Sequence, residues 1–321
     1  MDTILSFKTT FQATLQIFLL GAIGFLLFRK RFISEEGLAI LSRLVIEVTL
    51  PFLIFCQLIE GFSFSLYPNW WLFPILSLVI TALGFILARV ILVFYKNSSC
   101  KKEFISLVAF QNSGYLPLIL MATILPPNLR DIMFNYIFLF LLGFNLVIWS
   151  FGVWFIRGAL KESKSFEFGS LFSPPVLAIL ASLFLITFGL NKFVPALIVK
   201  PLKMVGDCTL PLAMIVVGGN LAAIKVFKTD KISVILLVMA KLILLPVFAL
   251  LILFNFRIDP LIGLLILLQA AMPSATSLSL IVRHYKLKEE LINQTVFITH
   301  IISLITIPFF LGIYGRFITL P

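Results

Sequence analysis

Long apolar stretches separated by short polar connections dominate the chain. About 20 consecutive apolar residues are needed to cross the hydrocarbon core of a bilayer, and the sequence divides into about ten such stretches. They cover residues 9–28, 37–60, 70–95, 103–125 and 132–156 in the first half, and 174–191, 196–221, 232–254, 260–282 and 290–316 in the second. The pattern predicts an all-α polytopic membrane protein of about ten transmembrane helices.

The composition agrees with this prediction and leaves no room for a soluble domain. Of 321 residues, 61% are hydrophobic and only 12% are charged, whereas soluble domains have about 25% charged residues. The net charge of +11 comes from short connections between the apolar stretches. That distribution argues against a nucleic-acid partner and for the lipid bilayer as the chain's surroundings.

The first apolar run, Phe11 to Phe28, is expected to be a transmembrane helix rather than a cleaved signal peptide. It is long, lacks a small-residue cleavage site, and precedes its positive cluster Arg29-Lys30-Arg31 instead of following it. The three cysteines are scattered, with neither a CxxC motif nor a histidine at ligand spacing. We therefore expect no metal site, no cofactor and no disulfide framework.

The distribution of Lys and Arg predicts the orientation. Alternate connections, including the one at 161–173, carry about twice as many Lys and Arg as those on the other side. Because basic residues stay in the cytoplasm, both termini are expected outside and the 161–173 linker inside. We expect an integral membrane protein, most simply of a bacterial inner (plasma) membrane.

An internal repeat organises the chain. Arg43-x3-Glu47-x-Thr49-Leu50-Pro51 matches Lys203-x3-Asp207-x-Thr209-Leu210-Pro211, 160 positions later. Each copy holds five apolar stretches, an odd number, so the second copy must lie inverted in the membrane. The expected division is a first repeat at 1–160, the linker at 161–173, and a second repeat at 174–321. Inverted repeats of this kind are typical of secondary transporters, with the site at the repeat interface.

Two apolar stretches are interrupted at matching places. Gln111 to Pro117 breaks the fourth stretch, and Gln269 to Ser274 breaks the ninth. Non-helical backbone at membrane depth must be packed in protein or line a cavity, because unpaired N–H and C=O groups are costly there. Each break is therefore either a packing kink or part of a site. Breaks at repeat-related positions favour a site where helices 4 and 9 cross at the midplane.

The residues of these breaks offer amides, hydroxyls and free helix ends. The half-helix N-termini after Pro117 and Pro273 suit an anionic group. The breaks hold no carboxylate, which favours an organic anion over a metal ion or a proton. The expected substrate-binding residues are Gln111, Asn112, Gly114, Tyr115, Pro117, Gln269, Pro273, Ser274, Thr276 and Ser277.

Two acidic residues in the repeat motif are candidates for holding a coupling ion. Glu47 and Asp207 are expected to be buried near mid-membrane, where ionisable groups are costly and often functional. Each follows a basic residue by one turn, Arg43 or Lys203, at pairing distance, and precedes a proline that frees a carbonyl. Proton or Na⁺ binding and a structural ion pair are both open.

Two further titratable residues lie deep in apolar stretches. Lys241 is too deep to reach water easily, so we expect it either to pair with Asp207, the favoured reading, or to neutralise a substrate carboxylate. His300 could relay a proton because histidine titrates near neutral pH. A lone histidine on an apolar helix is more often simply hydrogen-bonded, and that reading is favoured here.

These features together resemble the auxin efflux carrier family, which includes plant PIN-type transporters and bacterial malate and malonate permeases. The motifs are Gly24-Phe25-x3-Arg29-Lys30-Arg31-Phe32-Ile33-Ser34-Glu35-Glu36, Thr49-Leu50-Pro51, Asn112-Ser113-Gly114-Tyr115, Leu210-Pro211 with Gly218-Gly219-Asn220-Leu221, and Ala270-Ala271-Met272-Pro273-Ser274-Ala275 with Arg283-His284-Tyr285 and Ile305-Thr306-Ile307-Pro308. The resemblance covers essentially the whole chain, and the order and spacing of the motifs make it specific.

The resemblance implies two inverted five-helix repeats, a scaffold and a transport domain, and crossing helices 4 and 9. It also implies elevator-like transport of an organic anion, often by a homodimer, with Asn112, Pro117, Pro273 and Ser274 at the substrate. The chain departs from the family in helix 4. A glycine normally precedes the proline after a longer gap, whereas Leu116-Pro117 follows Tyr115 directly here. The departure bears on the shape of the pocket.

The function expected from the sequence is secondary active transport of a small organic anion by alternating access. The anion would be a carboxylate, a dicarboxylate or an auxin-like weak acid, with a proton or Na⁺ as coupling ion. The alternatives are a cation/proton antiporter of similar fold and a membrane sensor that binds a ligand without moving it. The sequence has no Ser/His/Asp or HExxH arrangement and no glycine-rich phosphate loop, so we do not expect an enzyme.

Overall fold

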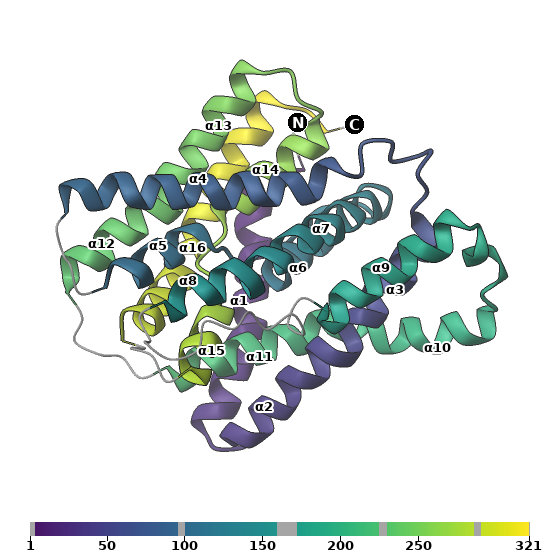
Figure 1. Ribbon diagram of the computed structural model, residues 1–321, viewed down its shortest axis with the longest axis horizontal. Helices are drawn as coiled ribbons and strands as arrows, with labels where there is room; N and C mark the ends of the chain where they lie inside the picture. Colours follow the sequence, from purple (N-terminus) through teal and green to yellow (C-terminus); the bar gives the residue numbers. More distant parts are fainter. Residues whose placement is uncertain (1–3, 96–99, 159–171, 225–229, 286–289, 321) are drawn as a thin grey trace.

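A computed structural model shows helices along all ten apolar stretches (Figure 1). The structure describes residues 4–95, 100–158, 172–224, 230–285 and 290–320. Within these residues, seven helical segments are long and apolar enough to cross a membrane, and three shorter apolar helices accompany them. The all-α polytopic membrane fold predicted from the sequence is confirmed.

Some stretches form one helix and others form several pieces in a row. The single helices are α1 (Phe7–Arg29), α4 (Leu72–Phe94), α9 (Pro174–Thr187) and α16 (Glu290–Phe317). The composite ones are α2 (Glu35–Leu44), η1 (Val45–Thr49) and α3 (Leu50–Gly61); α7 (Pro127–Val147), η2 (Ile148–Gly152) and α8 (Val153–Arg157); α10 (Ala196–Asp207) and α11 (Thr209–Ala223); and α12 (Lys231–Met239), η5 (Ala240–Leu244) and α13 (Leu245–Asn255). A short 3₁₀ turn, η4 (Leu190–Phe193), precedes α10.

Three of the composite stretches contain a π-helical turn, and in two of them a proline follows. Pro51 comes just after η1, and Pro246 just after η5. Proline lacks an N–H and cannot complete the regular helical hydrogen bond. Widening the helix by one residue accommodates that defect, and such π-turns are frequent at functional sites.

The two interrupted stretches are each split into two half-helices. The fourth consists of α5 (Lys101–Ala109) and α6 (Tyr115–Ile124), and the ninth of α14 (Pro260–Ala271) and α15 (Ser277–His284). Extended backbone at 110–114 and 272–276 separates the halves. The breaks expected from the polar residues are therefore present.

Helix boundaries repeat at the same spacing of 160 residues as the sequence motif. Adding 160 to the bounds of α4 gives 232–254, against Lys231–Asn255 for α12 to α13. The same sum carries α5 to 261–269, against Pro260–Ala271 for α14. The division at 160 and 174 stays a prediction, because most of the 161–173 linker lies outside the described residues.

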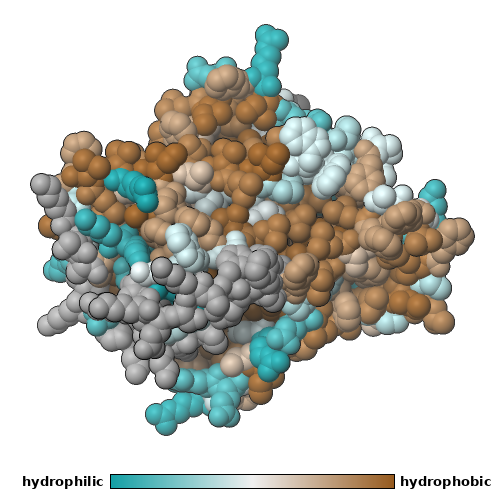
Figure 2. All heavy atoms as spheres, viewed as in Figure 1, coloured by the Kyte–Doolittle hydropathy of each residue, from teal (hydrophilic) through white to brown (hydrophobic). Residues whose placement is uncertain are grey.

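The outer surface is apolar, and the middle of α7 is buried and apolar on every side. Figure 2 shows hydrophobic residues over much of the visible face, with hydrophilic residues gathered at its margins. On α4, Val93 and Phe94 are 69% and 86% exposed, as suits contact with lipid. On α7, the run Ile137 to Phe140 is fully buried, since a helix that is hydrophobic all round belongs in the interior.

Helix α1 lies against α11 and α16. A Cβ on Gly218 of α11 would lie 1.8 Å from the carbonyl oxygen of Gly21, and one on Gly24 would lie 2.1 Å from that of Ile215. Glycine is required at such places because small residues let helix backbones approach closely in a membrane. The start of α1 also packs on the end of α16, so both ends of the chain lie at the same end of the molecule (Figure 1).

Candidate functional site

The two breaks meet as short antiparallel strands. Gln111 and Ser274 form an antiparallel bridge. The Asn112 N–H donates to the Pro273 carbonyl at 2.8 Å, and the Ala275 N–H donates to the Phe110 carbonyl at 3.0 Å. Backbone groups freed from one half-helix are thus satisfied by the other break. This explains how extended backbone is tolerated inside the bundle.

Side chains connect the crossing further. The Ser274 hydroxyl donates to the Leu107 carbonyl at 2.7 Å, and the Gln269 amide donates to the Ser113 carbonyl at 3.2 Å. In a continuous helix the Leu107 carbonyl would accept from the N–H of residue 111. Ser274 therefore takes over a carbonyl that the break has freed. Both side chains act first as supports of the crossing.

A central cavity of about 190 Å³ lies beside the crossing. Its wall comes from the two breaks with the first residues of α6 and α15, and from α2, η1, α3, α7, η2, α9 and α11. Six of the expected substrate-binding residues line it: Gln111, Asn112, Gly114, Tyr115, Thr276 and Ser277. The other four, Pro117, Gln269, Pro273 and Ser274, are buried behind its wall.

Five polar residues that were not among the expected substrate-binding residues also line the central cavity. They are Ser42, Ser113, Asn145, Ser173 and Asn220. Asn145 and Asn220 are amides within apolar helices, and polar residues in such places often mark a site. That signal was present in the sequence. What it lacked was the packing that brings α7 and α11 to the same cavity.

Gln111 is the polar side chain with most unused bonding capacity at the central cavity. It is fully buried, and within the described chain neither its amide nitrogen nor its amide oxygen has a hydrogen-bond partner. Buried polar groups are rarely left unpaired, because each costs about 1–3 kcal/mol. A polar ligand that reached this amide would satisfy both atoms.

A second, lateral cavity of about 250 Å³ lies between α1, α11 and α16. Its wall is apolar except for Asn112 and His300. The Asn112 amide nitrogen lies 3.3 Å from His300 Nε2, and His300 Nδ1 lies 2.8 Å from the Val296 carbonyl. The Nδ1–H therefore donates to the carbonyl and Nε2 accepts from the amide. This geometry agrees with the simple hydrogen-bonding role, and Asn112 separates the two cavities.

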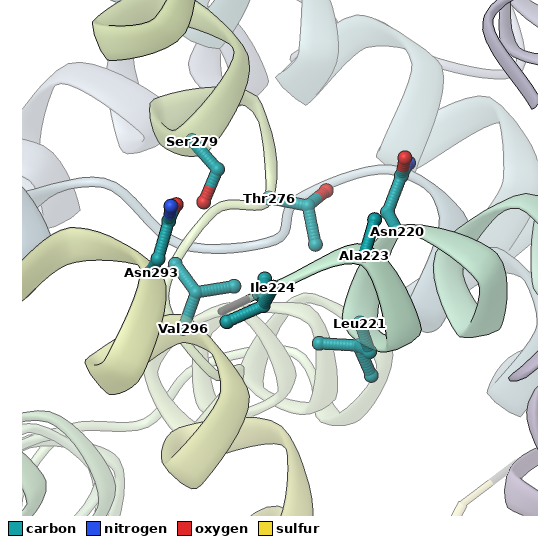
Figure 3. A pocket seen from close by; sticks show the side chains of 8 residues that line it. All are labelled: Asn220, Leu221, Ala223, Ile224, Thr276, Ser279, Asn293 and Val296. Carbon is teal, nitrogen blue, oxygen red and sulfur yellow. The ribbon is translucent and has the colours of Figure 1, made fainter. Parts of the chain in front are cut away.

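A small polar cavity of about 30 Å³ continues from the central one, sharing Asn220 and Thr276 with it. In Figure 3, Ser279 and Asn293 lie on one side of this space, and Thr276 and Asn220 on the other. A cavity of this size holds about one water molecule. The space on this side of the central cavity is therefore too small for an organic anion, and its wall is partly polar.

Lys241 does not pair with Asp207, and the favoured expectation is wrong. Lys241 is 1% exposed, and its Nζ donates to the Val108 carbonyl at 2.9 Å. Val108 lies in the last turn of α5, so the ammonium stands at the end of a half-helix that leads into the crossing. Asp207 is the last residue of α10 and is exposed.

The two acidic candidates lie on the outside of the chain rather than buried. The Glu47 side chain is 47% exposed and pairs with Arg43, with 3.1 Å between the Arg43 Nε and a carboxylate oxygen. The i,i+4 pair expected there is present. Lys203 instead binds Glu60 at 2.5 Å. The i,i+4 spacing correctly predicted the Arg43–Glu47 pair, but in the folded structure both carboxylates lie away from the crossing.

The comparison with known proteins agrees with the geometry of broken, crossing helices. No curated protein matches the chain. The family model described as "Membrane transport protein" matches residues 9–311, nearly the whole chain. Helices of spanning length and an amide-lined cavity at the crossing are what a membrane transporter requires. The chain therefore belongs to the membrane transport protein family, which is the auxin efflux carrier family that its motifs resemble.

Proposed function

We propose that this protein is a secondary active transporter that moves a small organic anion through the crossing by alternating access. The observation that carries the proposal is the wall of the central cavity. It combines amides and hydroxyls with the N-terminal ends of two half-helices, α6 at Tyr115 and α15 at Ser277. The described wall contains no carboxylate.

The helix ends supply the attraction for an anion. The first N–H groups of a helix have no partner within it, and the helix dipole makes that end positive. Gly114, at the N-cap of α6, provides no capping side chain. At the start of α15 the Leu278 and Ser279 N–H groups already donate to the Ala275 and Thr276 carbonyls. A carboxylate in the central cavity would therefore accept from the N–H groups at the start of α6, while Asn112 and Gln111 donate from their amides.

The size of the cavity supports a small substrate. Pockets for drug-sized ligands measure about 300–1,000 Å³, whereas the central cavity has about 190 Å³. A short carboxylic or dicarboxylic acid, or a compact aromatic acid, suits this volume. The bound anion would travel with the crossing in an elevator-like movement past α1 and α11, with both termini outside.

We further propose that the chain works as a homodimer. The ion pairs Arg43–Glu47 and Lys203–Glu60 are exposed on helices of the bilayer-spanning segments. Charged groups in contact with lipid are unfavourable, and a second copy would cover them. Cross-linking in membranes through a cysteine at position 43 tests this arrangement; absence of a dimer band would contradict it.

Flux through proteoliposomes tests transport. Radiolabelled malate and benzoate are offered under opposing Na⁺ and proton gradients, with Asn112→Ala as the test variant. Asn255→Ala is the matched control, because Asn255 is exposed and its amide bonds only within its own helix. We expect saturable uptake of at least one acid by the wild type and the control, and at least a tenfold loss in Asn112→Ala.

The alternatives give different results in the same experiment. Ion movement without any organic anion would indicate a cation/proton antiporter. Thermal stabilisation by an acid that is never taken up would indicate a sensor. Absence of uptake for both acids under both gradients would overturn the proposal.

A further inference from the structure

Lys241 is a fully buried basic residue with no acidic partner among the described residues. None of the salt bridges formed by the described residues includes it. The elements packed against η5 are α4, α5, α12, α13, α14 and α16. The described acids of these elements stand at their N-terminal ends, either at the N-cap or within the first three residues: Glu103, Asp230, Asp259 and Glu290. Burying a charge in this way is costly unless something compensates it.

The carbonyl that Lys241 contacts has been freed by the break in the helix. In a continuous helix, the Val108 carbonyl would accept from the N–H of Asn112. That N–H donates instead to Pro273 across the crossing. The Val108 carbonyl is left at the negative end of α5 and is taken by the Lys241 ammonium. The contact is therefore a direct consequence of the crossing.

A cation is the ligand that such a position attracts. In transporters with broken helices, freed carbonyls and C-terminal half-helix ends coordinate the coupling ion, Na⁺ or a proton. Here the side chain of Lys241 supplies the positive charge from within the protein. The lysine has no counterpart in the first repeat. The residue 160 positions earlier is Thr81, whose buried hydroxyl has no partner among the described residues.

We propose that Lys241 is a tethered cation that occupies the position of a coupling metal ion, so that the anion binds and moves without Na⁺. The inference rests on the proposed function and names its coupling. Lys241 does not itself line the central cavity, but its ammonium lies on the Val108 carbonyl, in the half-helix that leads into the crossing. With no acid paired to it among the described residues, the ammonium is compensated through the crossing when an anion occupies the central cavity. The same cavity thereby discriminates against cations.

The first experiment measures uptake of malate and benzoate by wild-type proteoliposomes in NaCl and in choline chloride at equal ionic strength. We expect rates within twofold of each other. A tenfold loss in choline chloride would overturn the tethered cation while leaving anion transport in place. Absence of uptake in both salts would overturn the proposed transport, and the Tm of Lys241→Ala with n-propylammonium and with n-propanol, measured in the second experiment, would still decide the role of Lys241.

The second experiment tests whether uptake depends on the charge of the Lys241 side chain or only on its volume. Lys241→Ala is studied with n-propylammonium, and with n-propanol as a neutral compound of similar shape. We expect uptake to fall at least tenfold, n-propylammonium to restore part of it and to raise the Tm of the variant, and n-propanol to do neither. Lys200→Ala, which removes an exposed lysine, should behave as wild type with either compound.

A third variant guards against a folding defect. Lys241→Met keeps the length of the side chain and removes the charge, so it should retain the Tm of the wild type and lose uptake. Equal rescue of Lys241→Ala by n-propanol, or normal uptake by Lys241→Met, would show that the residue only fills space and would overturn the proposal.

Discussion

The two halves of the crossing share one backbone plan and differ in charge. In the first repeat, the freed carbonyl of Val108 accepts from an ammonium, Lys241. The position 160 residues before Lys241 is Thr81, a neutral hydroxyl in α4. The two repeats thus break their helices at matching places, and they differ in the side chain that brings a charge to the crossing.

The Asn112 amide at the crossing also has no counterpart in the second repeat. Asn112 donates to His300, whereas the positions related to them by 160 residues are Met272 and Phe140, which are both fully buried. One half of the crossing therefore presents a polar pair and the other half an apolar one. We conclude that the backbone of the crossing provides the scaffold of the site, and the differences between the repeats provide its chemistry.

Replacing Lys241 by the residue found at the matching position of the first repeat should have the largest effect on uptake. Lys241→Thr copies the residue of the first repeat and removes the positive charge, so we expect uptake of malate and benzoate to fall at least tenfold. Thr81→Val is the matched change in the other repeat. It should leave uptake within twofold, because the Thr81 hydroxyl has no partner among the described residues. Equal losses in both variants would contradict the asymmetry.

The second-largest effect is expected when position 112 receives the residue found at the matching position of the second repeat. Asn112→Met places there the residue found at 272 and removes the amide that lines both larger cavities. Loss of a hydrogen bond of about 1.4 kcal/mol corresponds to about tenfold in affinity, and competition binding with labelled malate or benzoate measures it. Met272→Leu should bind within twofold of wild type. Unchanged affinity in Asn112→Met would place the anion elsewhere.

The two glutamines should separate binding from stability. Gln111→Leu replaces an amide without a described partner, so we expect unchanged thermal stability and anion affinity lowered several-fold. Gln269→Leu loses the hydrogen bond to the Ser113 carbonyl, which is worth about 1 kcal/mol. Thermal unfolding with and without the anion distinguishes them. The opposite pattern would exchange their roles.

The smallest expected effect is on thermal stability, and it concerns the N-terminal ends of α4 and α12. Asp230 caps α12 through the N–H groups of Ile232 and Ser233, while α4 has no side-chain cap. Hydrogen bonds from the Tyr95 hydroxyl and then from Ser233 lower the pKa of Asp230 from 3.8 to about 2. Because the folded pKa is depressed, this stabilisation is present above about pH 4 and is lost as the pH falls toward 2.

Asp230→Asn tests this cap, since it removes the charge and keeps a capping side chain. The wild type should have a slightly higher Tm than the variant at pH 6, and the difference should shrink as the pH is lowered below 4. A difference independent of pH would contradict an ionised Asp230. Trp71→Ala, at the uncapped start of α4, should show no such pH dependence.

The amino-acid sequence alone determined the helices, their breaks and the repeat. These features depend on local properties: the length of an apolar run, the missing N–H of a proline, and polar residues where a helix must open. The expected crossing of helices 4 and 9 is also present, since the backbone groups freed in one break pair with those of the other. Gln111, Asn112 and Thr276 were identifiable because they stand in the breaks themselves.

Only the tertiary structure decided which side chains meet. Helices such as α11 and α13 are apolar on nearly every side, so their sequences do not indicate which face turns inward. That Asn145 and Asn220 face the central cavity could therefore not be read from the chain. Glu47 and Asp207 lie on other helices and face outward. The partner of Lys241 could not be read from the chain either, because a backbone carbonyl becomes available only where two breaks pair with each other.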